Sequence, residues 1–256
     1  MINNFRVIPV LLLQDDGLVK TRQFKNARYV GDPINAIKIF NDKEVDELIF
    51  LDIDASKERR GPNFEILKEI ASECFMPLGY GGGITSMNHV DRLFQIGLEK
   101  VVLNSVALTN PDFITEVAKK VGSQSVVVSI DVKQNWRGKR QVYSHHNNSL
   151  VPKDVVSFAK KMEQLGAGEI FLNSVNRDGM MSGYDLDIIN QVAENISLPL
   201  VACGGAGSLN HMQQAIAEGK ASAVGAGSLF IFHGTHKAVL INYPKQEKLI
   251  ELFNGK

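Results

Sequence analysis

Eight short apolar runs recur along the chain, and each is followed by a longer segment with the periodicity of an amphipathic helix. Most of these runs are continuous rather than alternating, which is typical of strands buried on both faces. Eight strand–helix units favour a closed (β/α)₈ barrel over an open doubly wound sheet. The chain has 256 residues, which fits one barrel domain spanning 1–256. The predicted strands are Val7–Leu13, Leu48–Ile53, Leu78–Tyr80, Val101–Leu103, Val126–Ile130, Ile170–Leu172, Leu200–Cys203 and Ala223–Ala226.

The two halves of the chain resemble each other. Pro77–Gly83 is echoed by Pro199–Gly205, and Asn88-His89 returns as Asn210-His211 at a nearly constant spacing. Several echoes at one spacing indicate an internal repeat. The sequence therefore predicts two similar half-barrels of four strands each.

Glycine clusters follow the third and seventh predicted strands, and small or polar residues follow the fourth and eighth. Glycine lets the backbone turn sharply and lets N–H groups approach an anion closely. In barrels, phosphate often binds between the loop after strand seven and a helix start after strand eight. The duplicated pattern predicts two phosphate sites at one mouth, with tight turns that bind no ligand as the alternative. The residues concerned are Gly82, Gly83, Asn104, Ser105, Gly204, Gly205, Gly227 and Ser228.

Carboxylates gather where the predicted strands end. Asp52 and Asp54 lie at the end of the second strand, Asp131 ends the fifth, and Asp178 follows the sixth. Catalytic groups of barrels gather at this face, where a carboxylate can act as general acid or base. Helix caps or loop salt bridges are the alternative. Asp131 is the strongest candidate, because burial at the end of a very apolar strand would raise its pKa.

Four charged residues stand at the opposite ends of the strands. Arg6, Glu47, Lys100 and Glu169 begin the first, second, fourth and sixth strands. Two cations and two anions at these positions could form a ring across the barrel floor. From the residues alone this is a structural ion cluster, because buried ion pairs are weak evidence for stability or function.

The composition argues against several classes of protein. Lys+Arg and Asp+Glu both number 28, so no overall basic field attracts nucleic acid or an anionic membrane. Two cysteines favour a reduced cytoplasmic setting, the N-terminus is not typical of a signal peptide, and no apolar stretch is long enough to span a membrane. The adjacent His145 and His146 have no third ligand at a suitable spacing, so neither a metal nor another cofactor is predicted.

Together these motifs resemble, end to end, the cyclase subunit of imidazole glycerol phosphate synthase, the HisF family. The resemblance implies a (β/α)₈ barrel that takes ammonia from a HisH-like glutaminase docked on its floor. It implies delivery of that ammonia to a bisphosphorylated substrate at the other face, through a gate formed by the four charged residues at the strand starts. The matching strings are Arg6-Val7-Ile8-Pro9, Asp46–Ile53, Gly81-Gly82-Gly83-Ile84, Ser129-Ile130-Asp131, Leu165–Ile170, Arg177-Asp178-Gly179 and Gly204-Gly205-Ala206-Gly207.

The resemblance also assigns roles to single residues. Asp131 matches one of the two aspartates with which the family closes and cleaves its ring. Lys20, in the mobile loop after the first strand, matches a lysine used in activity and in coupling to the glutaminase. Asp52, Asp178 and Gly179 fall in segments that hold phosphate or other groups of the substrate.

The other catalytic aspartate of the family is absent. Its position, at the end of the first strand, is held by Leu12, which cannot donate or accept a proton. Losing one general acid or base typically costs about 10²–10⁴ in rate. Asp15 and Asp16 follow in the loop, and we expect them to point elsewhere.

A retained ammonia conduit without the full catalytic pair suggests another ammonia acceptor. The chain resembles in this respect a divergent branch associated with bacterial surface-polysaccharide clusters. That branch acts with a glutaminase-like subunit and an ATP-using amidotransferase, and converts a sugar acetamido group into an acetamidino group. The first hypothesis is therefore ammonia delivery to a phosphorylated sugar. The alternatives are the cyclase of histidine biosynthesis itself and a non-catalytic scaffold that activates the glutaminase.

Overall fold

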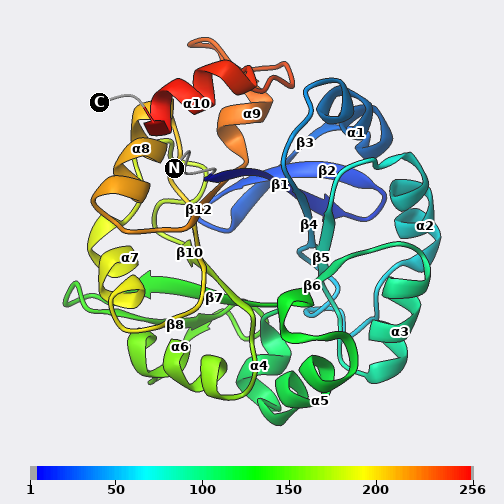
Figure 1. Ribbon diagram of the computed structural model, residues 1–256, viewed down its shortest axis with the longest axis vertical. Coiled ribbons are helices and arrows are strands. Elements are labelled where there is room, and N and C mark those ends of the chain that lie inside the picture. Colours follow the sequence, from blue (N-terminus) through cyan, green and yellow to red (C-terminus); the bar gives the residue numbers. More distant parts are fainter. Residues whose placement is uncertain (1–4, 255–256) are drawn as a thin grey trace.

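A computed structural model, which describes residues 5–254, shows eight parallel strands closed into a barrel (Figure 1). The barrel strands are β1 (Arg6–Gln14), β4 (Leu48–Asp52), β5 (Leu78–Gly81), β6 (Lys100–Leu103), β7 (Val126–Gln134), β10 (Glu169–Ser174), β11 (Leu200–Cys203) and β12 (Ala223–Ala226). The ring closes where β1 pairs with β12, with Arg6 opposite Ala223 and Pro9 opposite Ala226. The two halves join a second time where β6 pairs with β7, with Val101 opposite Val126. The predicted (β/α)₈ barrel is confirmed.

Helices surround the barrel on its outside (Figure 1). They are α1 (Pro33–Asp42), α2 (Phe64–Glu73), α3 (Met87–Gln95), α5 (Asp112–Val121), α6 (Val155–Gln164), α7 (Leu186–Ala193), α8 (Leu209–Ala217) and α10 (Gln246–Asn254), with the short α4 (Ser105–Thr109) and α9 (Ser228–Ile231), and a 3₁₀ turn at Ser123–Ser125. Asp32 caps α1 by accepting from the Asn35 N–H at 2.8 Å, and Asp154 caps α6 in the same way. Within the described part of the chain, none of the helices combines the length and apolar character needed to cross a membrane.

The barrel strands serve two cores at once. One set of alternate residues packs outward against the helices in a large buried cluster that includes Val7 and Leu11. The other set, including Ile8, Val10 and Phe171, forms a separate buried cluster in the barrel interior. Successive side chains of a strand point to opposite faces. This division explains why the predicted strands are continuously apolar rather than alternating.

Two β-hairpins follow the first and fifth barrel strands. The first consists of β2 (Gly17–Arg22) and β3 (Lys25–Gly31), and the second of β8 (Arg140–Ser144) and β9 (Ser149–Leu150). They meet through Phe24, whose ring centroid lies 6.2 Å from that of Tyr143 and 5.2 Å from that of His145. The resemblance had implied that Lys20 lies in a mobile loop. The structure instead places it in strand β2. A further small hairpin, β13 (Phe232–His233) with β14 (Ala238–Val239), precedes α10.

The repeated Asn-His pairs have a structural explanation. Ser86 accepts from the backbone N–H of His89 and thereby caps α3, while the His89 ring nitrogen accepts from the Thr85 N–H at 3.4 Å. His211 at the start of α8 repeats both contacts, with Ser208 as the cap and the Gly207 N–H as the donor at 3.2 Å. Each histidine thus fastens the loop that follows one glycine cluster.

Candidate active site at the barrel mouth

A cavity of about 310 Å³ lies where the carboxyl ends of the eight barrel strands meet. Every residue predicted to take part in catalysis or substrate binding lines it, namely Asp131, Lys20, Asp52, Gly82, Gly83, Asn104, Ser105, Asp178, Gly179, Gly204, Gly205, Gly227 and Ser228. The structure therefore brings the predicted mouth residues together in one place. The predicted gate residues lie at the other end of the barrel, where β1, β6 and β10 begin.

Asp131 lies at the centre of this cavity's polar wall. Its side chain is buried and accepts from the Nδ2 of Asn104 at 3.2 Å and from the Nδ2 of Asn173 at 3.3 Å. Burial raises the pKa of Asp131 to about 7, and the two amide donors only partly oppose this effect. A carboxyl with such a pKa can both donate and accept a proton near neutrality.

Asn173 was not predicted as a site residue. It lies one residue before the end of β10, faces Asp131 across the β7–β10 pairing, and its buried Oδ1 atom has no hydrogen-bond partner within residues 5–254. The repeat contained the signal that could have found it, because Phe171-Leu172-Asn173 echoes Phe50-Leu51-Asp52. Asn173 thus holds in the second half of the barrel the position that Asp52 holds in the first.

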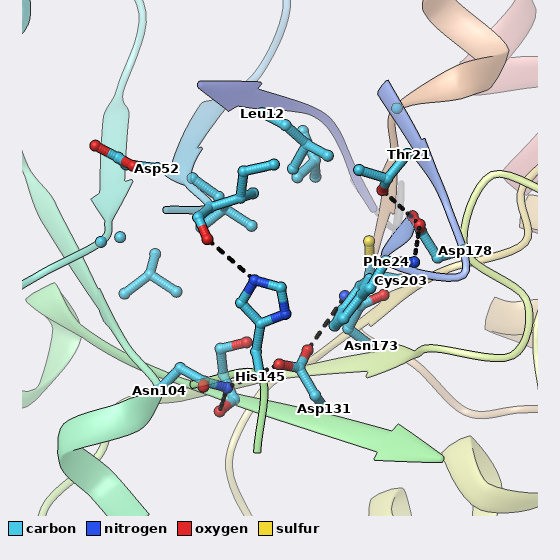
Figure 2. A pocket seen from close by; sticks show the side chains of 18 of the residues that line it. Leu12, Thr21, Phe24, Asp52, Asn104, Asp131, His145, Asn173, Asp178 and Cys203 are labelled. Atoms are coloured by element: carbon cyan, nitrogen blue, oxygen red, sulfur yellow. Dashed lines mark hydrogen bonds between the residues drawn. The ribbon is translucent and has the colours of Figure 1, made fainter. Parts of the chain in front are cut away.

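Leu12, at the position where the resemblance implies a second catalytic aspartate, lines the cavity (Figure 2). It lies beside Leu51 in the β1–β4 pairing, so an apolar patch faces the polar wall around Asp131. Asp15 and Asp16 are exposed, and neither is among the residues that line the cavity. No carboxylate of the loop after β1 therefore replaces the missing one.

Lys20 reaches into the mouth from the first hairpin. Its Nζ donates to the backbone carbonyl of Val10 at 2.6 Å, and burial lowers the pKa of Lys20 to about 8. A Cβ at position 227 would lie 2.3 Å from this Nζ, so glycine there makes room for the lysine. The ammonium group is held at the edge of the predicted phosphate loop that contains Gly227 and Ser228.

Asp178 fastens the first hairpin over the mouth. Its Oδ2 accepts from the Thr21 hydroxyl at 2.7 Å and from the Phe24 N–H at 3.2 Å, as Figure 2 shows. Burial raises the pKa of Asp178, and these two hydrogen bonds counteract the rise. The Asp178 carboxylate thus holds the first hairpin through these two hydrogen bonds. Gly179, the next residue along the chain, also lines the cavity.

Asp52 forms an ion pair with Arg60. The guanidinium of Arg60 donates to both carboxylate oxygens of Asp52, at 2.6 and 3.0 Å, and the backbone N–H groups of Asp54 and Ala55 also donate to this carboxylate. The bidentate geometry is the strong form of an arginine–carboxylate pair. Asp52 thereby shapes the segment between β4 and α2, next to the first glycine cluster.

The two glycine clusters adopt backbone conformations that require glycine. Gly83 has φ +65°, and a Cβ there would lie 2.3 Å from the Arg60 carbonyl oxygen. Gly205 has φ +113°, and a Cβ there would lie 2.1 Å from the Gly183 carbonyl oxygen. Tight packing alone explains these residues, yet both clusters also line the same cavity, as the prediction of two phosphate sites demands.

The second hairpin adds His145 to the cavity wall. Its Nε2 lies 3.0 Å from the Ile53 carbonyl oxygen, and the neighbouring His146 contacts the Ser56 carbonyl oxygen at 2.7 Å through Nδ1. His145 lines the cavity, whereas His146 does not. Among residues 5–254, no three His, Cys, Asp or Glu side chains converge as a metal site would need.

The four charged residues on the floor form a closed ring. Lys100 Nζ lies 2.8 Å from Glu47 and 3.0 Å from Glu169, and Arg6 pairs with the same two glutamates. Both glutamates are buried, while Arg6 and Lys100 are partly exposed. The ring carries no net charge and closes the barrel interior at the end opposite the cavity.

Fold and cavity place the chain among (β/α)₈ barrels with a ligand site at the carboxyl ends of the strands. Residues 6–237 match the family described as "Histidine biosynthesis protein", so the chain belongs to that family.

Curated relatives match nearly the whole chain. It is 51% identical over 244 residues to the "Putative imidazole glycerol phosphate synthase subunit hisF2" of Pseudomonas aeruginosa, which covers 95% of this chain and 97% of that protein. It is 49% identical over 240 residues to the "Putative imidazole glycerol phosphate synthase subunit HisF" of Leptospira borgpetersenii, covering 93% and 94%. It is 46% identical over 251 residues to the "Putative imidazole glycerol phosphate synthase subunit hisF3" of Vibrio vulnificus, covering 96% of each. These matches confirm the predicted membership of the HisF family.

Proposed function

We propose that this barrel receives ammonia from a HisH-like glutaminase docked on its floor and delivers it to a phosphorylated substrate in the mouth. The ring of Arg6, Glu47, Lys100 and Glu169 supports an entrance at the floor, because it places polar side chains at the base of an otherwise apolar barrel interior. The two glycine clusters and Lys20 around one cavity support a phosphorylated ligand.

The acceptor of the ammonia is a sugar, which is converted from an acetamido to an acetamidino form for a surface polysaccharide. The observation that carries this step is Leu12, an apolar side chain in the cavity at the position of a ring-closing aspartate. A barrel that keeps the floor ring but lacks this proton carrier is suited to ammonia transfer more than to the two-aspartate reaction. An ATP-using amidotransferase would activate the sugar for attack.

The direct test reconstitutes the complex. The chain is purified with a glutaminase-like protein and a candidate amidotransferase from the same organism, and is supplied with glutamine labelled with ¹⁵N in its amide. Mass analysis with candidate sugar nucleotides should find a product in which one oxygen is replaced by a ¹⁵NH group. The variant Lys100→Met, compared with the wild type, tests the entrance at the floor ring. We expect it to form less product from glutamine.

The cyclase of histidine biosynthesis is the second candidate, favoured by the descriptions of the relatives. Expression of the chain in a strain that lacks its own cyclase separates the two candidates. Growth without added histidine would refute the sugar as the acceptor, whereas continued dependence on histidine agrees with it.

A scaffold that only binds and activates the glutaminase is the third candidate. It requires the floor ring but not the carboxyl at the mouth. If Asp131→Asn leaves the output of amidated sugar intact while Lys100→Met abolishes it, the scaffold explanation holds and delivery at the mouth does not.

A further inference from the structure

The second hairpin carries a histidine to the side of the mouth where the catalytic aspartate is missing. The Ile53 carbonyl that contacts His145 follows directly on β4, and the Ile53 N–H donates to the Leu13 carbonyl oxygen at 3.1 Å. The imidazole is therefore tied through one residue to the end of β1, next to Leu12. Both side chains line the same cavity, and Figure 2 shows the ring of His145 in the space between Leu12 and Asp131.

The contact with Ile53 fixes which nitrogen can work as a base. A carbonyl oxygen can only accept, so Nε2 must carry the proton that the hydrogen bond requires. In the neutral imidazole, Nδ1 is then the unprotonated nitrogen. Figure 2 shows this second ring nitrogen on the side of the ring toward Phe24 and Asp131. Packing of Phe24 edge-on against the ring, with centroids 5.2 Å apart, holds this orientation.

The surroundings of His145 favour the neutral ring. Burial lowers the pKa of His145 below its ordinary value, the nearby Lys57 lowers it further, and the Ile53 carbonyl and Asp54 oppose this shift. Across the cavity, the pKa of the Asp131 carboxyl is raised to about 7. Lys57 and Asp54 from the segment after β4 and His146 from its own hairpin act directly on the charge of the ring. The other ionisable side chains that line the same cavity are Lys20, Lys25, Asp52, Asp131, Asp178 and Cys203.

We propose that Nδ1 of His145 is the proton acceptor that takes over the role of the carboxylate missing at Leu12. The proposal rests on the proposed delivery of ammonia to an electrophilic carbon in the mouth. With the amide oxygen carrying the group transferred from ATP by the amidotransferase, attack by ammonia forms the new carbon–nitrogen bond and moves the π electrons of the carbon to the amide nitrogen. His145 takes one proton from the positively charged incoming nitrogen. The carbon–oxygen bond then breaks, the oxygen leaves with the activating group and takes a proton from Asp131, and a nitrogen lone pair forms the C=N bond of the amidine. Exchange with water returns both groups to their starting states.

A measurement on the protein alone tests the first requirement. Long-range ¹H–¹⁵N spectra of the full chain labelled in its histidines should show His145 neutral at pH 7 and protonated at Nε2 alone, with His145→Gln identifying its signals. A ring protonated at Nδ1 at this pH could not accept a proton there and would overturn the proposal, whatever the acceptor of ammonia is.

Kinetics test the second requirement in the reconstituted complex, with ammonium chloride as the nitrogen source so that the glutaminase step does not limit the rate. Glutamine places its amide nitrogen close to the Nε2 position, so His145→Gln can keep the bond to Ile53 while removing the base. We expect kcat to fall about 10²-fold with little change in KM, and the rising limb of the pH profile, once rates are divided by the free ammonia present at each pH, to disappear. The control is His146→Asn, which lies outside the cavity and should keep the wild-type rate.

The outcomes separate the two proposals. An unchanged rate and pH profile in His145→Gln, with product formed by the wild-type chain, would reject His145 as the proton acceptor. Absence of amidated product from the wild-type complex would reject the proposed function, and the tautomer measurement would still decide whether His145 can act as a base. A second variant, Leu12→Asp in the His145→Gln background, should recover part of the lost rate if the two positions share one role.

Discussion

The buried carboxyl of Asp131 should make the protein less stable as the pH rises, and replacing it should remove that loss. Its pKa is about 7 in the folded chain against 3.8 for the unperturbed group. The folded state therefore binds a proton that the unfolded state has already released between these values. Because of this difference, the free energy of unfolding falls as pH rises from about 4 to about 7, and the contribution levels off above that range.

The size of the effect follows from the shift. A difference of about 3 pKa units corresponds to about 4 kcal/mol at pH 8, since each unit is worth about 1.4 kcal/mol. Asp131→Asn removes the ionisation but gives up one of the two amide hydrogen bonds, at about 1 kcal/mol. We expect the variant to be more stable than the wild type by about 3 kcal/mol at pH 8 and slightly less stable at pH 4.

Urea unfolding of both chains between pH 4 and pH 8 measures this difference, because all other titrating groups cancel in the comparison. Asp42→Asn, at an exposed carboxylate that ends α1, is the matched control and should run parallel to the wild type. Parallel curves for the Asp131 variant and the wild type would refute the reasoning, since they would mean that Asp131 titrates alike in the folded and unfolded chains.

Three further changes test the floor, the phosphate loop and the hairpin. Lys100→Met leaves two buried glutamates with a single cation and should cost about 3–5 kcal/mol in urea unfolding; an unchanged midpoint would mean that the ring is not formed. Gly227→Ala places a methyl group against the Nζ of Lys20 and should cost about 1–3 kcal/mol by the same assay, unless the lysine leaves the cavity. Thr21→Val removes the hydroxyl that binds Asp178 and should speed amide exchange in the first hairpin about five-fold; equal exchange rates would show that the hydroxyl does not hold the hairpin.

Most of the barrel could be predicted from the sequence because its strands are buried on both faces. The runs at Leu200–Cys203 and Ala223–Ala226 coincide with β11 and β12. The predictions at Val126–Ile130 stopped short, since β7 continues to Gln134 as one side of a hairpin. Lys20 was placed in a loop by the resemblance, and the sequence around it offered no pattern that would correct this. Hairpins at the mouth pair only with their own neighbours and have mixed burial, so no continuous apolar run marks them.

The site was predictable where chemistry depends on the ends of barrel strands. Asp131 and the glycine clusters lie there, and the closed barrel brings these ends together whatever the loops do. Asn173 was visible only through the internal repeat. The position of His145 at the cavity could not be predicted, because it depends on where the second hairpin folds back over the mouth. Two adjacent histidines in a polar segment do not indicate which ring, if either, faces a site.

The alternation of side chains along the barrel strands couples the floor to the mouth. On β6, Lys100 of the ring and Val102 of the interior face the same way, and Asn104 continues this face into the cavity. Adding or deleting one residue within such a strand would move the side chains beyond that point to the opposite face of the barrel wall, while those before it keep their orientation. Descendants of this barrel can therefore change their chemistry by exchanging single side chains, as at Leu12, but not by changing strand length between its two ends.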